Sequence, residues 1–188
     1  MKFRTVTMAM AAALMCAPAA AAPIDHGRAT RWDASLQSRS DGKGTTTYWG
    51  KGASYEIVRP GMTVFFLRRD DGALVPPMIR AAYVGDSWID LRSVTFTVGE
   101  RTYGPFADIY SKPTRIEVGA SLVVEALLFS VDTDEKWQML EGIAEADELG
   151  RPVIVVFDGE TRYGIELDPV SKRATGKVVR GFRNVQPH

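Results

Sequence analysis

Two aspartates flank a tryptophan in the middle of the sequence, at Asp86, Trp88 and Asp90. If residues 88–91 form a strand, the side chains of Trp88 and Asp90 point to the same face. Glycoside hydrolases use a pair of carboxylates at the scissile bond, and an aromatic ring can line the sugar site beside them. A turn aspartate next to a solvent-facing strand residue would give the same spacing. The segment therefore supports a carboxylate-dependent hydrolase as an alternative hypothesis.

Other catalytic residue types are scarce. Of the two histidines, His26 follows a predicted cleavage site and His188 ends the chain, positions that are usually poorly ordered. Ser87 therefore has no internal histidine to activate it. Ser40 and Lys43 have the spacing of a serine–lysine pair, but a predicted turn separates them. We expect no catalytic residue, no metal site and no cofactor. Whether the protein is an enzyme stays open, although the residue types argue against it.

Two groups of residues could instead bind a partner. The chain after Asp168 contains no acidic residue, so its basic residues could contact an anionic envelope ligand or an acidic protein. Exposed tryptophan and tyrosine side chains favour interfaces because they bury a large area and keep a polar group. A solvated basic edge and core packing of the aromatic rings are the alternatives. The predicted binding residues are Trp49, Tyr55, Trp88, Lys172, Arg173, Lys177, Arg180 and Arg183.

The N-terminus has the pattern of a secretory signal peptide. Basic residues at positions 2 and 4 precede an apolar run over residues 8–17, and small residues follow. The run is too short to span a bilayer, which takes about 20 helical residues. Cleavage after Ala21, with Ala19 completing the motif, makes residues 1–21 the signal peptide. Lipoprotein processing at Cys16 is the rival, but Met15 is not the small residue expected before such a cysteine.

Composition fits one ordinary globular domain. The chain has 188 residues, of which 45% are hydrophobic and 24% charged, and this excludes a disordered chain, a collagen-like repeat and a multi-span membrane protein. Its 23 basic and 23 acidic residues argue against nucleic-acid binding. Removal of the signal peptide would also remove the one cysteine, so the mature chain would contain no disulfide and no transmembrane segment.

Beyond a flexible lead-in at residues 22–30, the dominant pattern predicts β-structure over a single domain, residues 31–185. Apolar and polar residues alternate in short runs separated by turn residues every 8–12 positions, as in a sandwich or barrel. Pro76 and Pro77 argue against a central strand at that point. Candidate strands lie at 45–49, 62–67, 78–84, 88–91, 93–98, 122–129 and 153–157.

One amphipathic helix is expected near residues 133–148. Trp137, Leu140 and Ala144 share a face, and Asp132 could cap the helix N-terminus. Residues 170–185 have few apolar anchors and stay unassigned. The expected fold is thus mainly β: a β-rich α+β domain, with an antiparallel sandwich or barrel-like sheet and one α-helix.

From Leu149 onward the chain resembles the invasion-associated-locus-B-like exported bacterial proteins. The shared features are a short helix ending near Leu149-Gly150-Arg151, an apolar strand at 153–157 and a late Gly181-Phe182 pair. The resemblance implies an exported protein and supplies no catalytic residue.

Taken together, these features predict a small exported envelope protein, periplasmic or secreted, that acts as a non-catalytic binding module. The alternatives are the carboxylate-dependent hydrolase and a structural subunit of an envelope complex. A protein or an anionic envelope ligand is the expected partner, and the sequence leaves the oligomeric state open.

Overall fold

The computed structural model describes residues 36–50 and 60–185, which form ten strands and two helices. The strands are β1 (Leu36–Ser40), β2 (Thr45–Gly50), β3 (Gly61–Arg69), β4 (Leu74–Gly85), β5 (Ser93–Val98), β6 (Arg101–Phe106), β7 (Thr114–Val118), β8 (Leu122–Ser130), β9 (Val153–Asp158) and β10 (Arg162–Glu166). The helices are α1 (Asp134–Ala146) and α2 (Pro169–Val185).

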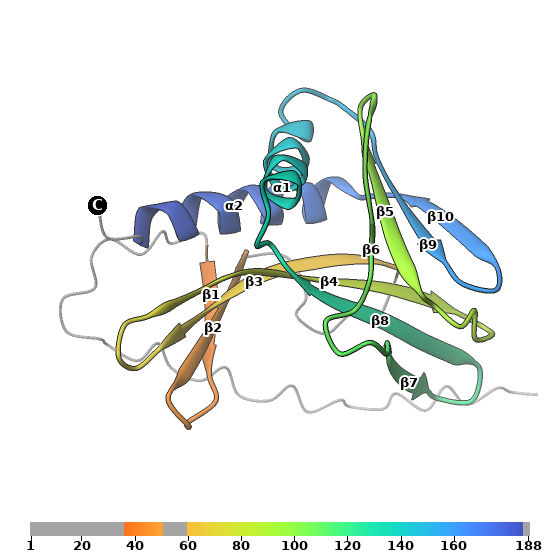
Figure 1. Cartoon of the computed structure of the whole chain (residues 1–188), viewed down its shortest axis with the longest axis horizontal. Helices are drawn as coiled ribbons and strands as arrows, with labels where there is room; N and C mark the ends of the chain where they lie inside the picture. The colour runs from red at the N-terminus through yellow and green to blue at the C-terminus, as the bar shows by residue number, and fades with distance from the viewer. Residues whose placement is uncertain (1–35, 51–59, 186–188) are drawn as a thin grey trace, which may run out of the picture.

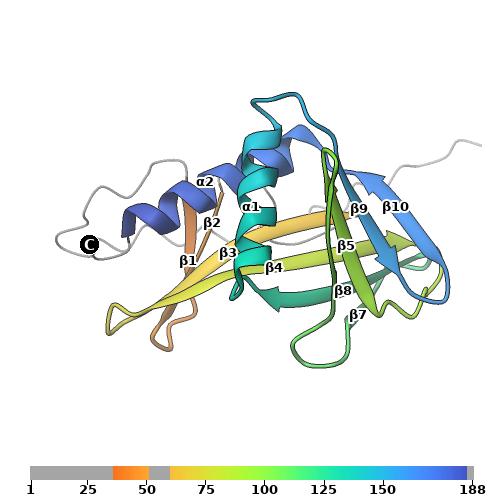
Figure 2. The same ribbon diagram turned by 45° about the horizontal axis from the view of Figure 1, so that its top comes forward.

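The strands form two antiparallel sheets (Figure 1). Sheet A has the order β1-β2-β3-β4-β8-β7, and sheet B has the order β10-β9-β5-β6. Sheet B and both helices lie on the same side of sheet A, and the turned view in Figure 2 shows the same arrangement. Helix α2 packs on β2 and β3, whereas α1 packs on α2 and β5. The predicted β-rich α+β class with antiparallel sheets is confirmed.

The hydrophobic core fills the space between these layers. In β5, Val94, Phe96 and Val98 are buried and alternate with partly exposed residues, as the period-two pattern predicts. Phe129 of β8 stacks on Phe106 of β6 with ring centroids 5.2 Å apart, so aromatic packing joins sheet A to sheet B.

Strand β4 runs through Pro76 and Pro77, contrary to the expectation that prolines exclude a central strand there. The ladder between β3 and β4 is irregular at this point: Leu67 pairs with Val75, and Phe65 pairs with Met78. Strand β8 pairs with β4 only from Met78 onward. The prolines therefore sit in a bulge, where no ladder hydrogen bond from their nitrogens is needed.

Helix α1 confirms the helix predicted at 133–148, with one change at its start. The cap is Thr133, whose Oγ1 accepts from the Lys136 amide, whereas Asp132 forms an ion pair with the Lys136 ammonium at 2.7 Å. The fully buried face includes Leu140 and Ile143, but Trp137 is only half-buried.

Helix α2 was not predicted. Pro169 is its first residue, and Asp168 before it accepts hydrogen bonds from the Ser171 amide at 3.0 Å and hydroxyl at 2.7 Å. This is the usual chemistry of a helix N-terminus. Two interior glycines weaken the local signal, yet one of them, Gly181, packs so closely that an added Cβ would lie 2.4 Å from Leu36.

Candidate binding site around Arg115

The loop between β4 and β5, residues 86–92, carries the residues that the sequence singled out. Ile89 and Leu91 are buried, whereas Trp88 and Asp90 point outward. The strand expected at 88–91 is absent because Asp90 has a φ of 51°, outside the extended region. Trp88 and Asp90 nevertheless share one side of the loop, since both contact Arg115 of β7.

Glu125 of β8 holds this loop in place. Its side chain is 0% exposed, and Oε2 accepts hydrogen bonds from the backbone amides of Ile89 at 3.0 Å and Leu91 at 3.1 Å. The other oxygen, Oε1, lies 2.8 Å from Arg115 Nε in an ion pair. A buried carboxylate is costly unless it is paired and hydrogen-bonded. Glu125 meets both conditions, and it thereby ties sheet A to the loop that leads into sheet B.

Sequence reasoning missed Glu125. A single acidic residue in the otherwise apolar run of residues 122–129 was the available signal, because its place in a buried strand requires a partner. The partner is Arg115, which lies directly opposite Glu125 in the antiparallel β7–β8 ladder.

Arg115 joins the three parts of the site. Besides Glu125, its guanidinium pairs with Asp90 and lies 5.4 Å from the centre of the Trp88 ring, in cation–π geometry. The hydrogen bond to Asp90 raises the pKa of Arg115, and the negative charge of Glu125 adds to this effect. The guanidinium is therefore a permanent cation.

An open pocket of about 310 Å³ adjoins Arg115. Its lining residues are Asp90, Leu91, Arg92, Ala107, Asp108, Ser111, Pro113, Arg115 and Leu127. The carboxylates of the pocket are already engaged: Asp90 pairs with Arg115, and Asp108 accepts from the backbone amides of Tyr110 at 2.7 Å and Leu128 at 2.6 Å. The remaining hydrogen-bonding capacity comes mainly from the donors of Arg92, Arg115 and Ser111.

The β9–β10 hairpin clamps the other side of the loop. The Glu160 amide donates to the Ile89 carbonyl at 2.5 Å, and the Arg92 amide donates to the Asp158 carbonyl at 2.8 Å. Gly159 allows this approach, since an added Cβ would lie 2.0 Å from the Ile89 oxygen. The loop is thus fixed before any ligand binds, which lowers the entropy cost of binding.

The other predicted binding residues lie elsewhere. Trp49 is in β2, near the opposite end of sheet A from β7, and Tyr55 lies outside the described residues. The basic residues are all on α2. Lys172 is buried and donates to the Arg151 carbonyl at 3.2 Å. Among the described residues, the structure therefore separates Trp88 from Trp49 and from the predicted basic residues of α2.

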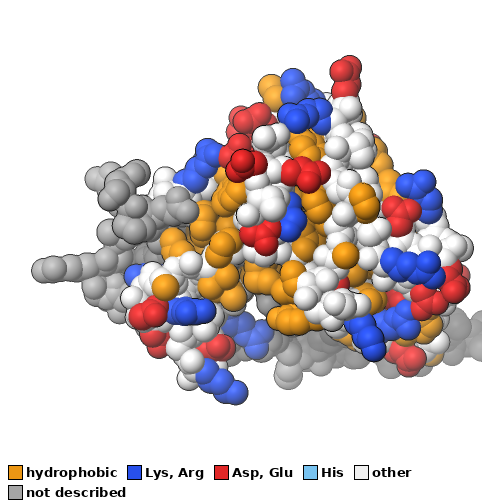
Figure 3. All heavy atoms as spheres, viewed as in Figure 1, with side chains coloured by type: hydrophobic (Ala, Val, Ile, Leu, Met, Phe, Trp, Pro, Cys, Tyr) orange, Lys and Arg blue, Asp and Glu red, His pale blue; other side chains and the backbone are white. Residues whose placement is uncertain are grey.

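Most of the basic side chains of α2 interact with other residues of the same chain. Arg173 pairs with Asp147 at 3.3 Å, and Arg183 pairs with Glu141, so these side chains hold α2 against α1 and the segment that follows it. Lys177 also takes part in an interaction, and Arg180 is exposed. On the face in Figure 3, basic and acidic side chains are intermixed rather than gathered into a patch of one sign.

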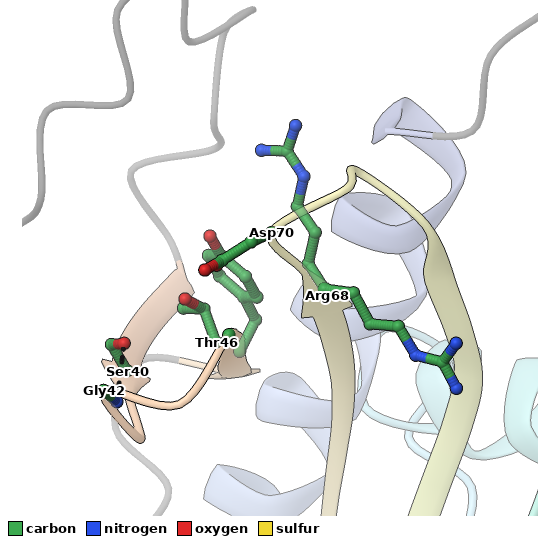
Figure 4. A pocket seen from close by; sticks show the side chains of 8 residues that line it. Ser40, Gly42, Thr46, Arg68 and Asp70 are labelled. Carbon is green, nitrogen blue, oxygen red and sulfur yellow. Dashed lines mark hydrogen bonds between the residues drawn. The ribbon is translucent and has the colours of Figure 1, made fainter.

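Two further pockets are less suited to a ligand. One of about 410 Å³ lies between the β1–β2 and β3–β4 turns and is lined by Tyr48, Arg68, Arg69, Asp70 and four small residues. Figure 4 shows the Asp70 carboxylate beside Thr46, whereas the Arg68 side chain is directed away from Ser40 and Thr46. The other, of about 550 Å³, is lined by five residues around the β5–β6 turn and has no aromatic side chain.

Within the described residues, histidine, cysteine and acidic side chains form no group of three that could hold a metal ion. In the same ranges, neither helix has the length and apolar character needed to cross a bilayer. Comparisons with protein-family models, with curated proteins and with solved structures find no match for this chain.

Proposed function

We propose that this protein is a non-catalytic binding module of the cell envelope, and that it binds a carboxylate-bearing ligand at Arg115. One observation supports the proposal above the others: the exposed ring of Trp88, on a loop that is fixed in advance, lies in cation–π geometry with Arg115 of β7, a permanent cation that lines an open pocket. Trp88 is 37% exposed, which is unusual enough for a tryptophan to suggest a role in recognition.

The free hydrogen-bonding groups define the ligand. Asp90 Oδ1 and both carboxylate oxygens of Asp108 already have partners, and the pocket also presents the guanidinium of Arg92, the remaining donors of Arg115 and the Ser111 hydroxyl. Such a set binds an acceptor with a negative charge, and guanidinium groups suit carboxylates in particular. The Trp88 ring, which contacts Arg115 next to the pocket, favours a ligand with an apolar or ring-shaped part next to its charge.

The hydrolase alternative has less support. Its mechanism requires one protonated carboxyl as general acid and a second carboxylate. Here Asp90 and Glu125 both form ion pairs with the Arg115 guanidinium, so neither carboxyl group is left unpaired beside the pocket. Glu125 is also fully buried, and Asp86 accepts a hydrogen bond from the Ser87 hydroxyl at 3.1 Å on an exposed part of the loop. These groups serve the structure of the loop rather than proton transfer.

Export is a separate part of the proposal. It rests on the signal-peptide pattern of residues 1–21, which lie outside the described residues. An oxidising compartment does not require disulfides, and a chain of this length can be stabilised by its core.

Titration with two carboxylate-rich probes tests the binding proposal. We would add a polyglutamate peptide or an acidic polysaccharide to the purified protein and follow tryptophan fluorescence and heat of binding. We expect saturable binding of at least one probe, weakened by salt. Arg92→Ala and Trp88→Ala should each weaken it about tenfold, which corresponds to about 1.4 kcal/mol.

The matched control is Arg39→Ala. Arg39 is an exposed arginine on β1, at the opposite end of sheet A, so this variant has the same charge change far from the pocket. Equal affinities for all variants, or no saturable binding of either probe, would refute the proposal. The two probes distinguish an acidic protein segment from an acidic polysaccharide.

A further inference from the structure

Strand β7 leaves an open edge on sheet A. It is the last strand in the sheet order, and within the described residues it pairs only with β8 (Figures 1 and 2). All five of its residues, Thr114–Val118, are exposed. An edge strand carries a row of backbone N–H and C=O groups that can pair with another strand.

The side chains of this edge alternate between charged and apolar. Arg115 and Glu117 point to the side of the sheet that carries Glu125, as the pairing of Arg115 with Glu125 shows. Ile116 and Val118 point to the other side, where Val118 lies opposite Leu122 of β8. Ile116 is 44% exposed, Val118 40% and Leu122 43%, so the edge ends in an apolar stripe.

The five residues are complementary to a second copy of themselves. If two β7 strands pair antiparallel about a two-fold axis at Ile116, Arg115 of each copy lies opposite Glu117 of the other, and Ile116 lies opposite Ile116. Opposite charges across an antiparallel pair stabilise it, whereas like charges destabilise it. A shift of the axis by one residue places either two arginines or two glutamates opposite each other.

The charges of the edge therefore select both the partner and the register. In a parallel, in-register pairing, Arg115 would lie opposite Arg115 and Glu117 opposite Glu117. Among the described residues, Glu117 forms no ion pair within its own chain, so it is free to accept one from a second copy. With two-fold symmetry, each Glu117 then lies opposite Arg115 of the other copy, and the two contacts are equivalent.

We propose that β7 is a homodimer interface, at which two copies join their six-stranded sheets antiparallel with Ile116 on the two-fold axis. This inference goes beyond the proposed ligand binding: both involve Arg115, and the interface adds Ile116 and Glu117, which do not line the pocket. A five-residue strand pair with its adjoining apolar stripe is small for an interface, so we expect a weak dimer that forms at high protein concentration.

Two opposite substitutions at the axis test the proposal. Ile116→Lys and Ile116→Glu each place like charges at the centre of the interface and should raise the dimer dissociation constant at least about tenfold. Mixing the two variants places lysine opposite glutamate and should restore association as a heterodimer. Sedimentation velocity of the wild type, each variant and the mixture, with a mass-tagged copy in the mixture, measures all four states.

The control is Leu149→Lys, which adds the same charge at an apolar residue that is 53% exposed and lies between α1 and β9. It should leave the dissociation constant unchanged, and circular dichroism should show that all variants are folded. The proposal is wrong if the wild type stays monomeric up to about 1 mM. It is equally wrong if either Ile116 variant dimerises like the wild type, or if the mixture fails to associate.

Discussion

Replacing Glu125 by alanine should strongly destabilise the protein. The substitution leaves the buried amides of Ile89 and Leu91 without their acceptor, and each unsatisfied amide costs about 1–3 kcal/mol. Arg115 also loses its partner, but its side chain is 44% exposed and keeps Asp90, so this contribution is small. We therefore expect a loss of about 3–5 kcal/mol in the free energy of unfolding, which lies within the combined cost of two unsatisfied buried amides.

Glu125→Gln separates the contribution of the negative charge from the contribution of the hydrogen-bond acceptor. The amide oxygen can still accept from both backbone amides, so this variant loses the charge assistance but keeps the acceptor. We expect a loss of about 1–2 kcal/mol, roughly the difference between a charge-assisted and a neutral hydrogen bond for two bonds. We therefore expect the wild type to be the most stable, Glu125→Gln to be less stable and Glu125→Ala to be the least stable.

Urea denaturation measures the free energies, and hydrogen exchange reports on the two amides directly. The alanine loss corresponds to a fall in melting temperature of roughly 6–20 °C for a domain of this size. Exchange at residues 89 and 91 should rise far more than at β5. The control is Glu166→Ala, an exposed glutamate on β10 whose replacement should change stability by less than about 0.5 kcal/mol. A loss below about 1 kcal/mol for Glu125→Ala would show that the carboxylate does not hold the loop.

The remaining predictions concern the helices, pH and export. Trp137→Ala should cost about 2–3 kcal/mol by chemical denaturation, below the 3–5 typical of a fully buried tryptophan, because the ring is half-buried; an unchanged midpoint would contradict its packing role. Asp168→Ala removes the α2 cap and should cost about 0.5–2 kcal/mol; intact stability would show that the cap is dispensable. Burial raises the pKa of Tyr48 and Tyr83 above 10.0, so the folded protein should lose stability as the pH rises through 10, where the unfolded tyrosines ionise first; a flat profile between pH 9 and about 11 would argue against this. Exported protein should begin at Ala22 by mass spectrometry, and its melting temperature should not respond to reductant; an intact N-terminus or a lipid on the chain would contradict the cleavage prediction.

The period of the apolar residues was sufficient to predict most of the secondary structure. The alternation in β5 and β9 places every second residue in the core, and the 3.6-residue period of α1 places Leu140 there too. These patterns can be read locally because backbone geometry alone decides which neighbouring side chains share a face. The sequence also identified Trp88 and Asp90 as a pair on one side, although the strand expected there is a loop.

Helix α2 depended on tertiary contacts. Gly176 and Gly181 lower the intrinsic helix propensity of the segment, so the local signal was ambiguous. In the folded protein two glycines allow α2 to pack closely on sheet A: an added Cβ at Gly181 would lie 2.4 Å from Leu36, and one at Gly50 of β2 would lie 2.3 Å from the Ala174 carbonyl oxygen. Burial against sheet A stabilises a helix that the isolated segment does not favour.

The charged residues show the clearest division between sequence and tertiary structure. The sequence showed that acidic and basic residues are balanced in number, but the pairs themselves join residues far apart: Arg115 with Asp90, and Arg183 with Glu141. Sequence alone thus predicted an exposed basic tail and overlooked Glu125, whereas in the folded protein Arg173 and Arg183 of the tail pair with residues of α1 and of the segment after it, and Glu125 fixes the loop at residues 86–92. The energy of an ion pair depends on the distance between its two charges in space, and the packing of the folded chain sets that distance.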